Sequence, residues 1–343
     1  MKKTTIAAIA ACVLGPVSAF AQSSVTVYGR VDTSVESTKT GSASALRMNN
    51  NSSRLGFRGT EDMGGGLQGL FGLELGIGSD DGSIGTPAFR NSYVGLRGAW
   101  GTAAMGRIDS AAPTHKPLYA IISRHMEFVA RDAGTTAISS SVLNVRTRTS
   151  NTLAYQSPVF NNIIARASYN LNGEGKTESA TGPIRWESDY RQADISLSYG
   201  EKDNSPLGLG IGWGHDSQRG GIPVNQFKDK WIGIASYDFG PVRVWGVYGQ
   251  DRFNHTATTR GKVGIALVGA SVEAGGNGKV VANYMTKDVQ SNPAAQRRRF
   301  QIGYTYVLSK RTALYALYDR DDPNSKANND VVRSFGVGLR HTF

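Results

Sequence analysis

The most constraining feature of this sequence is an alternation of apolar and polar residues that recurs along the chain. Successive side chains of a strand point to opposite faces, so the alternation predicts strands with one apolar and one polar face. Helical periodicity is scarce, and the one helix we predict is short, around Leu118 to Phe128. The alternating sets are Val25, Val27, Val31 and Val35; Leu67, Phe71, Leu73, Leu75 and Ile77; Ile195, Leu197 and Tyr199; Leu207, Leu209, Ile211 and Trp213; Val242, Val244 and Val247, which bracket Arg243 and Tyr248; and Leu314, Ala316 and Tyr318.

Short and long connections alternate between these strands. Short connections are expected at 61–66, 99–101, 157–162, 203–206, 240–241, 274–278 and 309–311. This spacing predicts about sixteen strands, within the even 8–26 range of bacterial barrels. Long connections rich in Ser, Thr, Asn and Gly are expected around Gly41, Asp80, residues 109–145, Gly173, Gly220, Asn254, Ser291 and Asn324.

Alternating turns and loops favour an all-β fold, a 16-stranded antiparallel transmembrane β-barrel. In hydrocarbon every backbone polar group must be paired, and a closed barrel leaves no edge. The alternative is a large soluble β-protein, but a propeller would show a blade repeat of about 40–50 residues, which we do not find. Aromatic residues beside the short connections predict an interfacial girdle, with ordinary strand aromatics as the alternative. These aromatics are Trp100, Phe160, Tyr199, Tyr237, Phe239 and Tyr306.

The first 21 residues predict a secretory signal peptide. Lys2 and Lys3 precede an apolar run over 6–17, and residues 19–21 read Ala-Phe-Ala, a small-residue cleavage pattern. The run is too short to span a bilayer, and no run of 18 apolar residues follows it. We therefore expect a signal peptide at 1–21 and a barrel domain at 22–343. Cys12 would leave with the signal, which excludes disulfides, thiolate metal sites and a cysteine nucleophile.

A basic charge balance points to acidic partners. The formal charge is +11, and removal of Lys2 and Lys3 leaves 36 basic side chains (38 minus two) against 27 acidic ones, or +9. Such a balance suits anionic solutes, anionic lipid or nucleic acid. The cluster Arg297-Arg298-Arg299 lies beside a long loop without a stacking surface, so we do not predict a nucleic-acid partner. The scattered histidines and the absence of catalytic motifs predict no metal, no cofactor and no enzymatic activity.

The C-terminal strand 331–343 alternates apolar residues and ends on Phe343. In this it resembles the general porins of Gram-negative bacteria, whose assembly machinery reads such a strand. Several ordered segments resemble the β-proteobacterial porins in particular, at 24–29, 53–62, 90–96, 106–107 and 148–158.

The resemblance implies an outer-membrane homotrimer surrounded by lipid and lipopolysaccharide. It implies passive diffusion of small hydrophilic solutes through each barrel. It also implies that the third loop, residues 109–145, folds inward and constricts the pore. The alternative for a loop of this length is a floppy external segment.

Charged residues on the polar faces are the candidates for pore lining and selectivity. Leu55 and Phe57 share the lipid face, so Arg54 and Arg58 are expected to point inward. Guanidinium groups stay charged and offer five donors, which suits small anionic solutes. The candidate cations are Arg30, Arg54, Arg58, Arg90, Arg107, Arg146, Arg148, Lys116 and Arg124, and the candidate opposing carboxylates are Glu74, Asp32 and Glu127.

Other readings stay open at this point. Individual arginines at the strand ends could instead bind lipopolysaccharide phosphate. The channel could be specific for an organic acid or phosphate, with a saturable site in its neck. The external loops could also carry the function, as in a surface adhesin or antigen.

Overall fold

The computed structural model describes residues 24–109, 114, 116–129, 143, 145, 148–171, 176–177, 185–186, 191–201, 205–217, 227–254, 260–290, 296–323 and 331–343. Arg146 and the predicted signal peptide lie outside these residues. The fold is a 17-stranded sheet in which every pairing is antiparallel, and β1 (Ser24–Thr40) pairs with β19 (Val332–Thr342) to close it. A separate two-stranded sheet joins β9 (Lys176–Thr177) to β10 (Arg185–Trp186).

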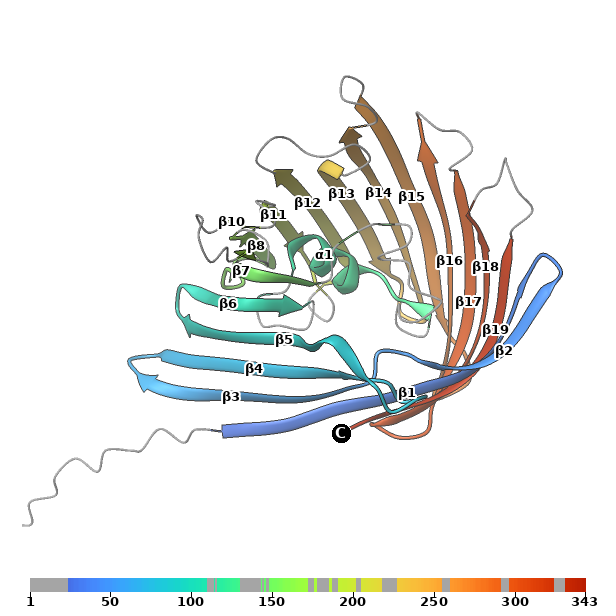
Figure 1. The fold of residues 1–343 in the computed structure, drawn as a ribbon, viewed down its shortest axis with the longest axis horizontal. Coiled ribbons are helices and arrows are strands. Elements are labelled where there is room, and N and C mark those ends of the chain that lie inside the picture. The colour runs from blue at the N-terminus through green and yellow to red at the C-terminus, as the bar shows by residue number, and fades with distance from the viewer. Residues whose placement is uncertain are drawn as a thin grey trace, which may run out of the picture.

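The other strands follow one another around the wall, which Figure 1 shows as a curved sheet. They are β2 (Ala43–Asn50), β3 (Arg54–Gly64), β4 (Leu67–Ile77), β5 (Ile84–Gly98), β6 (Gly101–Asp109), β7 (Arg148–Gln156), β8 (Ile163–Asn170), β11 (Arg191–Tyr199), β12 (Leu207–Ser217), β13 (Phe227–Asp238), β14 (Val242–Asn254), β15 (Arg260–Glu273), β16 (Gly278–Val289), β17 (Arg297–Val307) and β18 (Thr312–Asp322).

The strands β2 and β3 are two halves of one bent strand. Both pair with β1, and the register passes from Thr33 opposite Asn50 to Arg30 opposite Arg54. Residues 51–53 therefore face only two residues of β1, which is the signature of a β-bulge. Counted as one strand, the two halves make the barrel 16-stranded, and the predicted fold class is confirmed.

The apolar face of the sheet points outward. In β1, Val25, Val27 and Val31 are exposed, whereas the alternate residues Arg30 and Asp32 are buried. This is the reverse of a soluble sheet, and it is what a lipid-facing wall around a polar interior requires. The predicted girdle aromatics flank the short turns, and all are exposed except Tyr199, which is partly buried.

The seam between the two ends of the chain relies on a glycine. The backbone N–H of Gly29 donates to the Phe343 carbonyl at 3.0 Å, and the Phe343 N–H donates back at 3.1 Å. A Cβ on Gly29 would lie 2.3 Å from the Phe343 ring, so the ring covers the place where a side chain would stand. The terminal phenylalanine therefore packs against the first strand.

The helix α1 (Pro117–His125) lies inside the barrel against β11, β12 and β13 (Figure 1). It begins at Pro117, which suits the first helical position because that residue needs no N–H partner there. The inward face of β12 beneath the helix consists of glycines at 208, 210, 212 and 214. A Cβ on Gly212 would lie 2.5 Å from Leu118 Cδ2, so these glycines make room for the helix.

Two expectations were wrong in detail. The connection at Gly41 is a two-residue turn between two long strands, not a long loop. Val247 points inward and Tyr248 outward, because the wall beneath the third loop is apolar on its inner face as well. There Ile232, Ile234 and Val247 join one cluster with Ile121 and other loop residues. Within the described part of the chain, no helix is long and apolar enough to cross a membrane.

Candidate channel neck

A row of alternating charges crosses the inner wall from β3 to β7. Arg54 Nη1 lies 3.7 Å from Glu74 Oε1, and Arg90 Nε lies 3.0 Å from the same oxygen. Arg90 Nη2 lies 3.5 Å from Asp109 Oδ2, and Arg148 Nε lies 2.6 Å from that oxygen. Three guanidiniums thus share two carboxylates, and the row carries a net positive charge.

A β-bulge aims Arg90 into this row. Asn91 stands opposite Glu74 and Phe89 opposite Leu75, so Arg90 has no partner in the register of β4 and β5. On the C-terminal side of the bulge Val94 faces outward, and on its N-terminal side Phe89 faces outward. Bulges re-aim side chains in this way because one extra residue reverses the alternation.

The acidic side chains of the row are more deeply buried than the basic ones. Glu74 and Asp109 expose 0% and 1% of their side chains, whereas Arg54, Arg90 and Arg148 expose 19%, 14% and 32%. The carboxylates are covered by the arginines that pair with them. A solute near this wall therefore meets guanidinium groups first.

The arginines line two cavities. Arg30, Arg54 and Arg58 line a cavity of about 500 Å³, together with Arg97 and Glu74. Arg90, Arg107 and Arg148 line a second one of about 460 Å³. Arg58 is exposed, and its guanidinium carbon lies 5.0 Å from the centre of the Tyr28 ring. Basic side chains outnumber acidic ones in the lining of both cavities.

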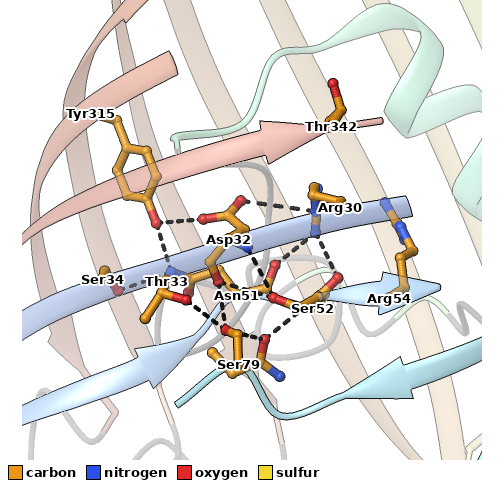
Figure 2. A network of polar contacts seen from close by, with 12 residues as sticks. Arg30, Asp32, Thr33, Ser34, Asn51, Ser52, Arg54, Ser79, Tyr315 and Thr342 are labelled. Atoms are coloured by element: carbon orange, nitrogen blue, oxygen red, sulfur yellow. Dashed lines mark hydrogen bonds and ion pairs between the residues drawn. The ribbon is translucent and has the colours of Figure 1, made fainter. Parts of the chain in front are cut away.

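Arg30 and Asp32 brace the bulge next to Arg54 (Figure 2). Arg30 Nη2 donates to the backbone oxygens of Asn51 at 2.7 Å and Ser52 at 3.1 Å. The Tyr315 hydroxyl donates to Asp32 Oδ1 at 2.7 Å, and the Asn51 amide donates to the same hydroxyl at 2.6 Å. Both charged side chains are buried, so they fix the shape of the wall.

The third-loop candidates pair with the part of the wall that runs from β11 to β16. Lys116 Nζ lies 2.9 Å from Asp194 Oδ2 on β11, and this lysine is buried. Arg124 Nε lies 3.7 Å from Glu201 Oε2, and Arg124 is partly exposed. Glu127 accepts from Lys279 Nζ at 3.3 Å. These ion pairs fasten the loop across the interior, opposite the arginine row.

Three members of the neck were missed from the sequence. Asp109 bridges Arg90 and Arg148, and its position at the end of β6, where the wall meets the third loop, is the signal that could have revealed it. Arg97 and Tyr93 line the first cavity, and they share the inward alternation of β5. Among the described residues, no group of three or more His, Cys, Asp and Glu could hold a metal ion.

Comparison with known proteins places the chain in a family. The Gram-negative porin family matches residues 6–326. Outer membrane porin protein 32 of Delftia acidovorans is 32% identical, and the alignment covers 100% of both chains. An outer membrane porin protein of Bordetella pertussis is 28% identical over the same full coverage.

Solved structures agree with this placement. The anion-selective porin from Comamonas acidovorans superposes with a TM-score of 0.71 at 26% identity, covering 94% of this chain and 100% of that one. OmpT of Vibrio cholerae, at 13% identity and a TM-score of 0.67, shares the fold. The chain therefore belongs to the Gram-negative porin family, and it is a passive channel of the outer membrane.

Proposed function

We propose that the channel prefers small anions and that the arginine row on β3, β5 and β7 selects them. The observation that carries the proposal is the difference in burial, with the guanidiniums partly exposed and the carboxylates beneath them fully covered. In a narrow lumen with walls of low dielectric constant, such a surface raises the local concentration of anions. The name of the Comamonas acidovorans porin, an anion-selective one, adds support.

We propose further that residues 109–145 form the constriction. The packing of α1 on the inner face of β12 and the three ion pairs of the loop support this, because they hold the loop within the barrel cross-section. The loop would then limit the size of a permeating solute on one side of the pore. Arg54, Arg90 and Arg148 would select the solute by its charge on the other side.

The reversal potential across a planar bilayer in a KCl gradient tests the filter. The neck variant is Arg54→Gln/Arg148→Gln, and the control Arg252→Gln/Lys262→Gln removes two positive charges from the outer face of β14 and β15. We expect the anion-to-cation permeability ratio to fall toward one in the neck variant only. An equal fall in both variants, or none in either, would contradict the filter and leave the porin assignment intact.

A second candidate is a channel with a saturable site for an organic acid or phosphate. The convergence of Arg90, Arg107 and Arg148 on one cavity of about 460 Å³ favours it, because several guanidiniums can bind one carboxylate or phosphate bidentately. Chloride conductance measured against rising concentrations of succinate or inorganic phosphate tests it. Saturable block at low concentration would support a binding site, and a linear response would support simple diffusion.

The assembly and processing of the chain are proposals as well. We propose a homotrimer, supported by the outward apolar faces and by the trimer form known for OmpT of Vibrio cholerae. Gel mobility before and after heating tests it.

We propose that residues 1–21 are removed on export, and N-terminal sequencing of the protein from outer membranes tests that.

A further inference from the structure

Two tyrosine rings cover glycines on the inner wall of the barrel. Tyr28 of β1 stands opposite Gly56 of β3, and Tyr93 of β5 stands opposite Gly72 of β4. A Cβ on Gly56 would lie 2.3 Å from Tyr28 Cζ, and a Cβ on Gly72 would lie 2.4 Å from Tyr93 Cε1. Each ring thus occupies the place of a side chain on the neighbouring strand. Both tyrosines line the first cavity, the one of about 500 Å³.

Arg58 stands between the two rings. Its guanidinium carbon lies over the Tyr28 ring, 5.0 Å from the centre. In the register of the sheet Arg58 is opposite Gly72, and Gly72 is opposite Tyr93, so only a glycine separates Arg58 from Tyr93. A guanidinium stacked on an aromatic ring keeps the N–H donors at its edge available for hydrogen bonds. The wall therefore presents a positioned cation between two aromatic rings.

Arg58 differs from the arginines of the neck row in its partners. Arg54 pairs with Glu74, and Arg90 pairs with Glu74 and Asp109. Arg58 is exposed to the lumen, and within the part of the chain that the structure describes it forms no ion pair. Its positive charge is therefore not offset by a carboxylate, and its donors face the solute.

The first cavity lies between the neck row and the short turns. Arg54 and Glu74 line it at the row, and Thr60 and Arg97 line it near the turns that follow β3 and β5. Short connections of outer-membrane barrels are periplasmic, so a solute entering from outside reaches this cavity after the row. A volume of about 500 Å³ falls in the range of about 300–1,000 Å³ that is typical of small-ligand sites.

We propose that this cavity binds small aromatic carboxylates, with the ring against Tyr93 and the carboxylate on Arg58. Aromatic pairs gain free energy beyond the area that they bury, and hydrogen bonds between a guanidinium and a carboxylate are among the strong ones. An aliphatic acid of the same charge would use the guanidinium alone. The inference rests on the channel function that the family provides and not on the arginine filter. It also concerns a different cavity from that of Arg107 and Arg148.

Block of the single-channel chloride conductance by two acids at neutral pH tests this site. Benzoate and cyclohexanecarboxylate carry the same charge and have nearly the same size, but only benzoate has an aromatic face. From the energy typical of an aromatic pair, we expect benzoate to reach half-block at a concentration about 3- to 10-fold lower. A failure of the arginine filter would change the block by both acids equally and leave this ratio intact.

Single variants with matched controls locate the two parts of the site. Tyr93→Leu should bring the ratio of the two half-block concentrations to about one, and Tyr93→Phe should keep it because the ring remains. The control Tyr248→Leu removes an exposed ring from the outer face and should also keep the ratio. Arg58→Gln should weaken the block by both acids about tenfold or more, whereas Arg252→Gln on the outer face should not.

The rings would be assigned to packing over the glycines alone if the two acids blocked the wild-type channel equally. A ratio that persists in Tyr93→Leu, or one that falls as much in Tyr248→Leu, would overturn the site as well. The Arg58→Gln measurement is independent of whether Tyr93→Leu folds. Unchanged block by both acids in Arg58→Gln, or no block by either acid in wild type, would overturn the proposal.

Discussion

Arg90 and Glu74 face each other across neighbouring strands, with 3.0 Å between Nε and Oε1. The contact exists because the bulge in β5 turns Arg90 inward next to Asn91, against the alternation that Val94 and Leu96 set. Glu74 thereby partly neutralises two arginines of the neck, Arg54 and Arg90. The selectivity of the channel should respond to this carboxylate as well as to the arginines.

Glu74→Gln should therefore raise the preference for anions, the opposite direction from Arg54→Gln/Arg148→Gln. The substitution removes one negative charge beneath the guanidiniums and keeps the shape and an accepting oxygen for Arg90. Reversal potentials in a KCl gradient measure the change. As a control, Asp322→Asn removes a carboxylate on the outer face and should leave the ratio unchanged. A Glu74→Gln channel with weaker anion preference would contradict the proposed direction of the field.

Gly212→Val should displace the helix α1 from the wall. The new Cβ would lie 2.5 Å from Leu118 Cδ2, and overpacking of this kind typically costs about 1–3 kcal/mol. We expect a lower single-channel conductance, because the helix can move only toward the lumen. Gly264→Val is the matched control, since a Cβ at Gly264 meets nothing within 4 Å. Equal conductance in both variants would mean that the helix does not limit the pore.

Lys116→Met should loosen the start of α1. It leaves Asp194 buried without its ammonium partner at 2.9 Å, and breaking a buried ion pair costs on the order of 3 kcal/mol. We expect more frequent spontaneous closures in single-channel recordings. The double variant Lys116→Met/Asp194→Leu should recover much of the loss, because an apolar pair needs no charge partner. A double variant as noisy as the single one would argue against the ion pair as the cause.

Glu201 should make the attachment of the helix sensitive to acid. Burial alone would raise the pKa of its carboxyl, but the hydrogen bond from Arg166 Nη1 at 2.5 Å and the charges of Arg166 and Arg124 outweigh it and hold the pKa below the usual 4.5. A depressed pKa means that the stabilisation is fully present above pH 4.5 and is lost as the pH falls through the lower value in the folded protein.

Conductance noise recorded from pH 6 downward measures this acid sensitivity. The wild-type channel should show low conductance noise above pH 4.5 and increasing conductance noise below it. Glu201→Gln should show the same noise at every pH, since it has no carboxyl to titrate. A titration that persists unchanged in Glu201→Gln would assign the effect to another group.

Local alternation along the sequence determined the strands, the barrel and the outward apolar face. Val25, Val27 and Val31 share one face because the side-chain period of a strand is two wherever pairing is regular, and no distant contact is needed to know it. The C-terminal strand ending on Phe343 and the ordered motifs of the family were also readable from the residues alone.

Only the tertiary structure decided which charges meet. Arg90 enters the neck through a bulge, which depends on the register between β4 and β5 and has no local signal. Lys116 was a candidate for the pore, yet it is buried against Asp194, some 78 positions away along the chain, because the helix packs on glycines of β12. The third loop covers Val247, which allows an apolar side chain on the inner face of β14. Register, bulges and loop packing are set by contacts between distant segments, and alternation within one segment cannot encode them.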